Sequence, residues 1–118
     1  CKRTGASLEV WDIDDSGAMD PKKLEQILDK PGEKPKLLSI AHISNVLGLV
    51  NPLADIIRIA HYYNAPVAVD GAQGIVHKKV DVRDMDADFY VFSGHKLYGP
   101  TGTGVLYGKE KYLEEMVP

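Results

Sequence analysis

The sequence has one cysteine and no long apolar run, and neither sign of charge dominates it. Its single cysteine, Cys1, cannot form a disulfide within the chain, which fits a reducing compartment and predicts a cytoplasmic location. No apolar run approaches the roughly 20 residues of a membrane span, and the first residues do not match a secretory signal peptide. With 14 Lys and Arg against 17 Asp and Glu, we expect no nucleic-acid or membrane partner.

What is present is an ordinary globular composition of 118 residues, of which 44% are apolar and 26% charged. This length suits one domain that can bury a core. The chain starts at CKRTGASLEV and stops at EEMVP, and neither end resembles a natural terminus. We therefore expect residues 1–118 to be one domain or a segment of one.

Strand and helix patterns alternate along the chain. Apolar runs or alternation predict strands at residues 6–13 (ASLEVWDI), 36–42 (KLLSIAH), 67–70 (VAVD), 88–93 (DFYVFS) and 104–107 (GVLY). Helices are predicted after the cap-then-proline pairs Asp20-Pro21 and Asn51-Pro52, ending near Lys30 and Asn64, and again at residues 109–116. This order predicts an α/β fold with a mostly parallel sheet, mixed at its late end where no helix separates the strands.

Polar side chains follow three of these strands where each strand ends. In open α/β sheets, ligands bind beyond the carboxyl ends of the strands, so these residues are candidates for a site. They are His42, Ser44 and Asn45 after the second predicted strand, Asp70 and Gln73 after the third, and Ser93, His95 and Lys96 after the fourth.

Lys96 and Asp70 indicate the chemistry of such a site. Most lysines are simply exposed on the surface, but an amine desolvated at this edge supports Schiff-base formation with a carbonyl. A carboxylate that closes a strand is often only a turn former, although it can also pair with a cationic ligand nitrogen. Pyridoxal 5'-phosphate requires both a Schiff-base lysine and an acidic partner for its ring nitrogen. Lys96 and Asp70, on neighbouring strand ends, are candidates for these two contacts.

The other candidates suit the rest of that cofactor. The hydroxyl of Ser93 and the imidazole of His95 can hold a phosphate beside backbone amides. The carboxamides of Asn45 and Gln73 can contact a ring hydroxyl, and loop hydrogen bonds to the backbone explain them about equally well.

Two other kinds of site are disfavoured. Residues 99–104 (GPTGTG) match the first half of a phosphate-binding P-loop, but Val105 and Leu106 stand where that motif needs Lys and Ser or Thr. These glycines are better explained by a tight connection. The histidines are scattered without metal-ligand spacing, so no metal site is expected, and His61 is expected to be structural.

Three stretches carry a specific resemblance: AHISNVLGLVNPL, VAVDGAQGIVH and DADFYVFSGHKLYGPTGTGVLYGK. They resemble the pyridoxal-phosphate-dependent class V aminotransferase family, and within it the cysteine desulfurases of the SufS/CsdA type. The resemblance implies the large cofactor domain of a fold-type I enzyme, of which residues 1–118 are the central segment. It implies that Lys96 is the Schiff-base lysine and Asp70 the ring-nitrogen partner. It also implies that Gln73 and Asn45 contact the phenolic oxygen, and that Ser93 and His95 contact the phosphate.

The resemblance further implies conversion of L-cysteine to L-alanine, with sulfur passed as a persulfide to an acceptor protein for iron–sulfur cluster assembly, in a homodimer. The persulfide cysteine and the substrate-binding arginine of that family would follow this segment, and Cys1 precedes Lys96, so we expect the segment alone to be inactive. Alternatives are another class V enzyme (selenocysteine lyase, kynureninase-like or epimerase-like) or a non-catalytic α/β nucleotide-binding module.

Overall fold

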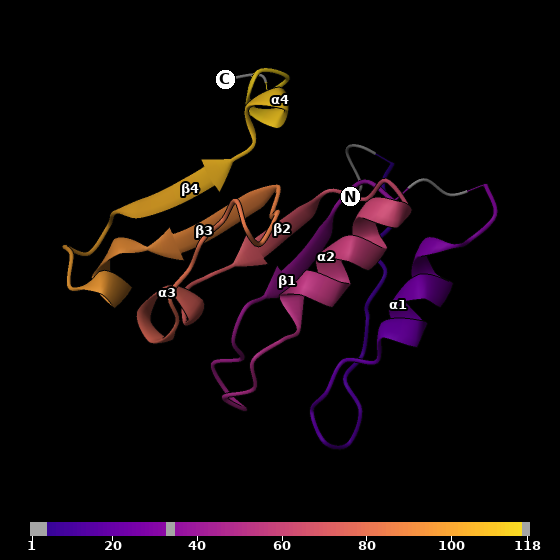
Figure 1. Ribbon diagram of the computed structural model, residues 1–118, viewed down its shortest axis with the longest axis horizontal. Coiled ribbons are helices and arrows are strands. Elements are labelled where there is room, and N and C mark those ends of the chain that lie inside the picture. Colours follow the sequence, from indigo (N-terminus) through magenta and orange to yellow (C-terminus); the bar gives the residue numbers. More distant parts are fainter. Residues whose placement is uncertain (1–4, 33–34, 117–118) are drawn as a thin grey trace.

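The computed structural model describes residues 5–32 and 35–116. Its elements follow the order α1 (Pro21–Leu28), β1 (Leu38–Ala41), α2 (Leu53–Tyr62), β2 (Val67–Asp70), α3 (Gly74–His77), β3 (Phe89–Ser93), the 3-10 helix η1 (Gly94–Leu97), β4 (Gly104–Gly108) and α4 (Glu110–Leu113). The strands form one sheet in the order β1-β2-β3-β4 (Figure 1). β1, β2 and β3 are parallel, whereas β4 is antiparallel to β3. The predicted α/β class, with a sheet that is mixed at its late end, is confirmed.

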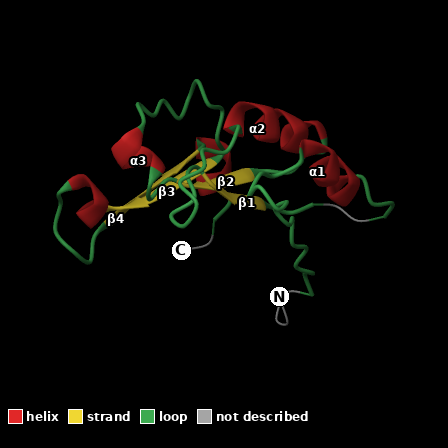
Figure 2. Ribbon diagram, turned by 90° about the horizontal axis from the view of Figure 1, so that it is seen from below, coloured by secondary structure: helices red, strands yellow, loops and turns green. Residues whose placement is uncertain are grey.

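The helices gather on one face of the sheet. Figure 2 shows α1, α2 and α3 on the same side, and α1 packs against α2. The core lies between this helical layer and the sheet, and its members include Leu24, Leu28, Ile56, Ile57, Ile59, Val67, Val69 and Tyr90. On the other face the sheet is open, because the side chains of Val91 and Leu106 are 43% and 56% exposed. On α2, the apolar spacing of Ile56, Ile57, Ile59 and Ala60 predicts a buried stripe, and all four residues are buried.

The starts of the two longer helices differ. Oδ1 of Asp20 accepts a hydrogen bond from Lys22 N at 2.9 Å, so Asp20 caps α1 as predicted. The same prediction for Asn51 is wrong, because Pro52 occupies the cap position of α2 and makes no side-chain cap bond. Nδ2 of Asn51 instead donates to the carbonyl oxygen of Ala41 at 2.7 Å, which ties the start of α2 to the end of β1.

The strand predicted at residues 6–13 is also wrong. These residues adopt no regular secondary structure, and Leu8, Val10 and Ile13 are 80%, 66% and 51% exposed. A strand is stabilised by a hydrogen-bonded neighbour, and the described sheet consists of β1, β2, β3 and β4 without this segment. Trp11 holds the segment to the body, since its Nε1 donates to the carbonyl oxygen of Asp20 at 3.2 Å.

Two short elements were not predicted, and the last helix is shorter than expected. α3 lies between the strands predicted at residues 67–70 and 88–93, and η1 directly follows the second of them. The helix predicted at residues 109–116 shrinks to Glu110–Leu113 and buries no side chain, so packing does not extend it. Among residues 5–32 and 35–116, no helix has both the length and the apolar character required to cross a membrane.

Candidate functional site

The register of the sheet brings three strand ends to one edge. Ala41 of β1 pairs with Asp70 of β2, and Asp70 pairs with Val91 of β3. β1 and β2 therefore end level with one another, and β3 runs two residues further to Ser93. The polar residues that the sequence placed after these strands consequently share the carboxyl edge of the sheet.

Lys96 and His95 lie on η1, the short helix that continues directly from β3. Gly94 N donates to the carbonyl oxygen of Thr103 at 2.9 Å, and Gly99 N donates to that of Gly94 at 3.0 Å, so η1 is fastened at both ends. Lys96 is half-buried and His95 is exposed. η1 contacts α3, which brings Lys96 to the neighbourhood of the segment that follows β2.

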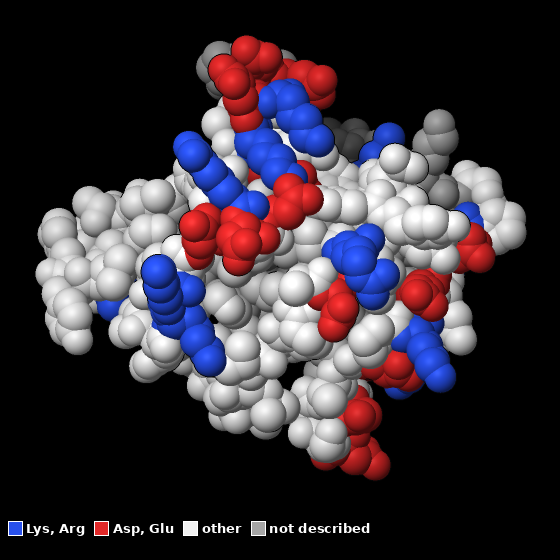
Figure 3. All heavy atoms as spheres, in the orientation of Figure 1, with Lys and Arg blue, Asp and Glu red and all other residues white. Residues whose placement is uncertain are grey.

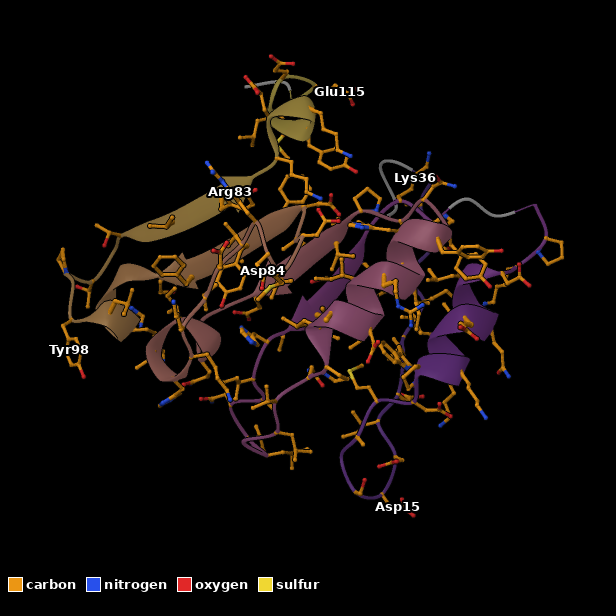
Figure 4. The ribbon with its side chains drawn as sticks, viewed as in Figure 1. Asp15, Lys36, Arg83, Asp84, Tyr98 and Glu115 are labelled. Carbon is orange, nitrogen blue, oxygen red and sulfur yellow. The ribbon has the colours of Figure 1, made fainter. Side chains whose placement is uncertain are left out.

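The glycine-rich stretch after η1 is a tight connection and not a P-loop. Gly102 has a φ of +82°, a conformation that favours glycine, and the stretch leads into β4 and not into a helix. Tyr98, at the end of η1, has a φ of 59° and is 97% exposed, and Figure 4 shows its side chain projecting from that end of the molecule. In Figure 3 this end is almost entirely white, whereas charges of both signs are mixed over the rest of the face.

Asp70 is exposed at the end of β2. Its Oδ1 accepts a hydrogen bond from Ala72 N at 2.9 Å, so one oxygen closes the turn that follows the strand. The role of turn former, which the sequence analysis considered for Asp70, therefore explains one of its two carboxylate oxygens. Its second oxygen has no partner within the described part of the chain, and it can accept a hydrogen bond from a ligand.

Asn45 and Gln73 come from different connections and meet at this edge. Nε2 of Gln73 donates to Oδ1 of Asn45. The loop that carries Asn45 is closed by hydrogen bonds from Ser44 N to the Leu49 carbonyl oxygen and from Gly48 N to that of Ser44, each 2.9 Å long. Beside the pair lies a cavity of about 350 Å³, lined by Ile43, Ser44, Asn45, Gly48, Val50, Gln73, His77 and Lys78.

Below this edge lies a buried pair of which the sequence indicated only one member. Nδ1 of His42 and the hydroxyl of Tyr90 are 3.0 Å apart. Burial lowers the pKa of His42, helped by the charge of Lys78. Burial also raises the pKa of Tyr90 to about 12, with a contribution from the charge of Asp70. Both rings are therefore neutral near pH 7. Tyr90 lies within the apolar run of β3, so the sequence pattern did not distinguish it from the other core residues.

A second polar cluster lies at the opposite edge, and the sequence did not indicate it. The carboxylate of Asp88 lies 2.7 Å from Nε2 of His61 and 3.0 Å from Nζ of Lys109. Next to it is the larger cavity, of about 460 Å³, lined by His61, Asn64, Ala65, Pro66, Asp86, Asp88, Lys109, Lys111 and Tyr112. Its charged groups neutralise one another, which agrees with the structural role expected for His61. A carboxylate directly before an apolar strand was the only signal for this cluster.

The carboxyl-edge side chains form a set with a definite chemistry. They comprise an amine, a carboxylate, two carboxamides, a hydroxyl and an imidazole, contributed by three adjacent strand ends and their connections. Such a set can hold a planar cofactor that carries a carbonyl, a ring nitrogen, a hydroxyl and a phosphate. Within the described residues, no group of three His, Cys, Asp or Glu side chains is arranged to hold a metal ion.

Comparison with known proteins identifies the family. The family model described as "Aminotransferase class-V" matches residues 1–118. A cysteine desulfurase from Shigella sonnei is 54% identical over 118 residues, which is 100% of this chain and 28% of that protein. The chain therefore belongs to the class V aminotransferase family, and it spans 28% of the length of this curated relative.

Two solved structures contain the same fold as this chain. The crystal structure of the cysteine desulfurase CsdA, in an S-sulfonic acid form, from Escherichia coli superposes with a TM-score of 0.91 at 44% identity, covering 99% of this chain and 29% of that one. SspA in complex with cysteine superposes with a TM-score of 0.86 at 33% identity, covering 99% of this chain and 33% of that one. The fold described above is thus that of a segment of these proteins.

Proposed function

We propose that these 118 residues are the central segment of the cofactor-binding domain of a pyridoxal-phosphate-dependent cysteine desulfurase. The observation that carries the proposal is the shared carboxyl edge, at which Asp70, Lys96 and the Asn45–Gln73 pair are gathered by the register and by the contact between α3 and η1. Named relatives and solved neighbours that are cysteine desulfurases support the same activity. Because the chain covers 28% of such a relative, the activity belongs to the full-length protein.

Lys96 and Asp70 would hold the two reactive parts of the cofactor. The half-buried amine of Lys96 would bind its carbonyl carbon, and the exposed carboxylate of Asp70 would accept a hydrogen bond from its ring nitrogen. Asp70 ends β2, and Lys96 lies on η1, which continues directly from the adjacent parallel strand β3, so both residues come from neighbouring parts of the carboxyl edge. Bound pyridoxal phosphate supplies an electron-withdrawing ring that stabilises negative charge at the substrate α-carbon.

The remaining candidates would anchor the periphery of the cofactor. Ser93 and His95 would bind the phosphate through their side chains, because the amide of Gly94 between them already donates to Thr103 at 2.9 Å. The second N–H of the Gln73 carboxamide and the N–H groups of Asn45 remain available for the ring hydroxyl once Gln73 has donated to Asn45. These contacts orient the ring and leave Lys96 as the group that moves a proton.

In the reaction with L-cysteine, the amine of Lys96 would be the group that moves protons at the substrate α-carbon. The C–S bond breaks as a cysteine thiolate of the full-length protein takes the sulfur as a persulfide, and the remaining carbon skeleton takes up a proton to become L-alanine. An acceptor protein, a homodimer and a cytoplasmic location complete the proposal. Selenocysteine would be the alternative substrate.

The test is reconstitution of the full-length protein with pyridoxal phosphate. We expect a visible absorbance band that Lys96→Ala abolishes, with turnover of L-cysteine reduced roughly 10²- to 10⁴-fold or more. Lys36→Ala, at an exposed lysine of the same chain, serves as the matched control and should leave the band and the turnover unchanged. Figure 4 shows Lys36 at the opposite end of the molecule from Tyr98.

Three outcomes would contradict parts of the proposal. A full-length protein without the band would favour a non-catalytic module. A band that survives Lys96→Ala unchanged would remove the assigned role of Lys96. The third outcome is a protein that shows the band but forms no alanine from L-cysteine. If it formed alanine from L-selenocysteine instead, or consumed another amino acid, it would have another activity of the class V family.

A further inference from the structure

The buried pair of His42 and Tyr90 lies directly beneath the segment that carries two of the proposed cofactor contacts. Tyr90 is 1% exposed on the central strand β3, and His42 is 8% exposed immediately after β1. Their side chains are 3.0 Å apart between the hydroxyl and Nδ1, and the rings meet edge to face at 84° with centroids 6.1 Å apart. The geometry fixes both rings relative to one another.

The backbone of the turn after β2 packs directly against these two rings, with no side-chain atom between. A Cβ added to Gly71 would lie 2.0 Å from Cε1 of Tyr90, and one added to Gly74 would lie 2.3 Å from Nδ1 of His42. Contacts that short are impossible, so only glycine allows the backbone to lie on the rings at these two positions. The height of the turn above the sheet is therefore set by the His42 and Tyr90 side chains.

Backbone hydrogen bonds fasten the same segment to its neighbours. His42 N donates to the carbonyl oxygen of Asp70 at 2.8 Å, and Gly71 N donates to that of Val91 at 2.8 Å. Asp70 precedes the first of the two glycines, and Gln73 precedes the second. A change in either ring must therefore move one or both of these side chains, because close-packed interiors do not absorb volume changes freely.

We propose that His42 and Tyr90 are positioning residues, which hold the turn formed by residues 70–74 at the height that presents Asp70 and Gln73 to the cofactor. This inference rests on the proposed function, and it assigns neither residue a contact with the cofactor. The pair is neutral near pH 7, since burial lowers the pKa of His42 and raises that of Tyr90. The pair therefore positions the carboxylate of Asp70 through packing and one hydrogen bond, and it places no charge beneath the cofactor ring.

The first test uses Tyr90→Phe in the full-length protein, which removes only the hydroxyl. We expect pyridoxal phosphate to bind about fivefold more weakly, the loss of one net hydrogen bond, and the pH midpoint of its visible band to shift. Amide hydrogen exchange at residues 71–74 of the cofactor-free protein should become faster. Tyr107→Phe is the matched control, because Tyr107 pairs with Tyr90 across the sheet from β4 and should change none of these three measurements.

The second test is a double-mutant cycle of Gly71→Ala with Tyr90→Leu. In the presence of Tyr90, the added methyl group collides with the ring, so Gly71→Ala should weaken cofactor binding more than tenfold. Interaction energies of this size are typical of two residues in direct contact. In the Tyr90→Leu background the ring is gone, and the same substitution should cost much less. The coupling reports the contact between the turn and the ring even where each single variant is also less stable.

The outcomes separate this inference from the proposed function. Normal cofactor affinity, an unshifted band and unchanged exchange in Tyr90→Phe would overturn the positioning role, and so would additive effects in the cycle. If the wild-type protein bound no pyridoxal phosphate, the proposed function would fail and with it the positioning of cofactor contacts. The exchange measurement would then still show whether the two rings hold the turn.

Discussion

Nε2 of His61, on α2, lies 2.7 Å from Oδ2 of Asp88, the carboxylate that immediately precedes β3. The same oxygen accepts a hydrogen bond from Val67 N at 2.8 Å, at the start of β2. The other oxygen lies 3.0 Å from Nζ of Lys109, which also pairs with Asp86 at 2.5 Å. One buried carboxylate thus joins a helix, two parallel strands and the segment after β4.

Replacing Asp88 should therefore destabilise the fold strongly. Asp88 is 1% exposed, and Asp88→Ala would leave the buried Val67 amide without its acceptor and His61 without the carboxylate 2.7 Å away, while Lys109 would keep only its pair with Asp86. We expect a loss of about 3 kcal/mol in the free energy of unfolding of the full-length protein, measured with urea. Asp84→Ala, at an exposed aspartate of the same connection (Figure 4), should cost less than about 0.5 kcal/mol. Equal losses in the two variants would show that the buried network contributes nothing.

The same carboxylate should make stability depend on acid pH. Burial opposes ionisation of Asp88, but hydrogen bonds from His61 and the Val67 amide and the nearby Lys109 lower its pKa below 3.8 overall. A carboxylate with a lowered pKa in the folded state stabilises the protein above the unfolded value, and this stabilisation is lost as pH falls through the folded value. The unfolding free energy should drop below about pH 3.8 less steeply in Asp88→Asn than in the wild type. Parallel pH profiles would contradict this prediction.

His42 should produce a second pH dependence nearer to neutrality. Burial, helped by the charge of Lys78, holds its pKa below the ordinary value of 6.5. Above pH 6.5 the ring is neutral in both states, whereas below it the unfolded chain gains a proton that the folded protein does not. The free energy of unfolding should therefore decrease as pH falls below 6.5 towards the folded pKa. His42→Gln should remove this slope whatever its effect on stability at pH 8, and an unchanged slope would assign the effect to another group.

Asn45 and Gln73 should act as a unit in cofactor binding. Because Gln73 donates to Asn45, removal of either amide disturbs the other. We expect Asn45→Ala and Gln73→Ala each to weaken pyridoxal phosphate binding by about fivefold in the full-length protein. The double variant should lose less than the product of the two effects, as residues in direct contact do. Gln26→Ala, at an exposed glutamine on α1, should combine multiplicatively with either one. Multiplicative effects for Asn45 and Gln73 would show that their contact is irrelevant to binding.

Local patterns were sufficient for much of the fold. The strands β2 and β3, the buried stripe of α2 and the Asp20 cap of α1 follow from apolar spacing and capping chemistry, which depend on near neighbours in the chain. The same patterns were misleading at residues 6–13 and at Asn51. There, an apolar alternation lies outside the sheet with Leu8, Val10 and Ile13 exposed, and an amide that could cap its helix bonds to β1 instead.

The candidate site, like the fold, could be predicted from the sequence only in part. The sequence by itself determined which polar residues follow the strand ends, because parallel strands present their carboxyl ends at one edge. Only the tertiary structure decided the register that aligns Asp70 with Ala41 and Val91, and the placement of the turn on the rings of His42 and Tyr90. The physical reason is that register and close packing depend on contacts between segments tens of residues apart, which no local pattern encodes.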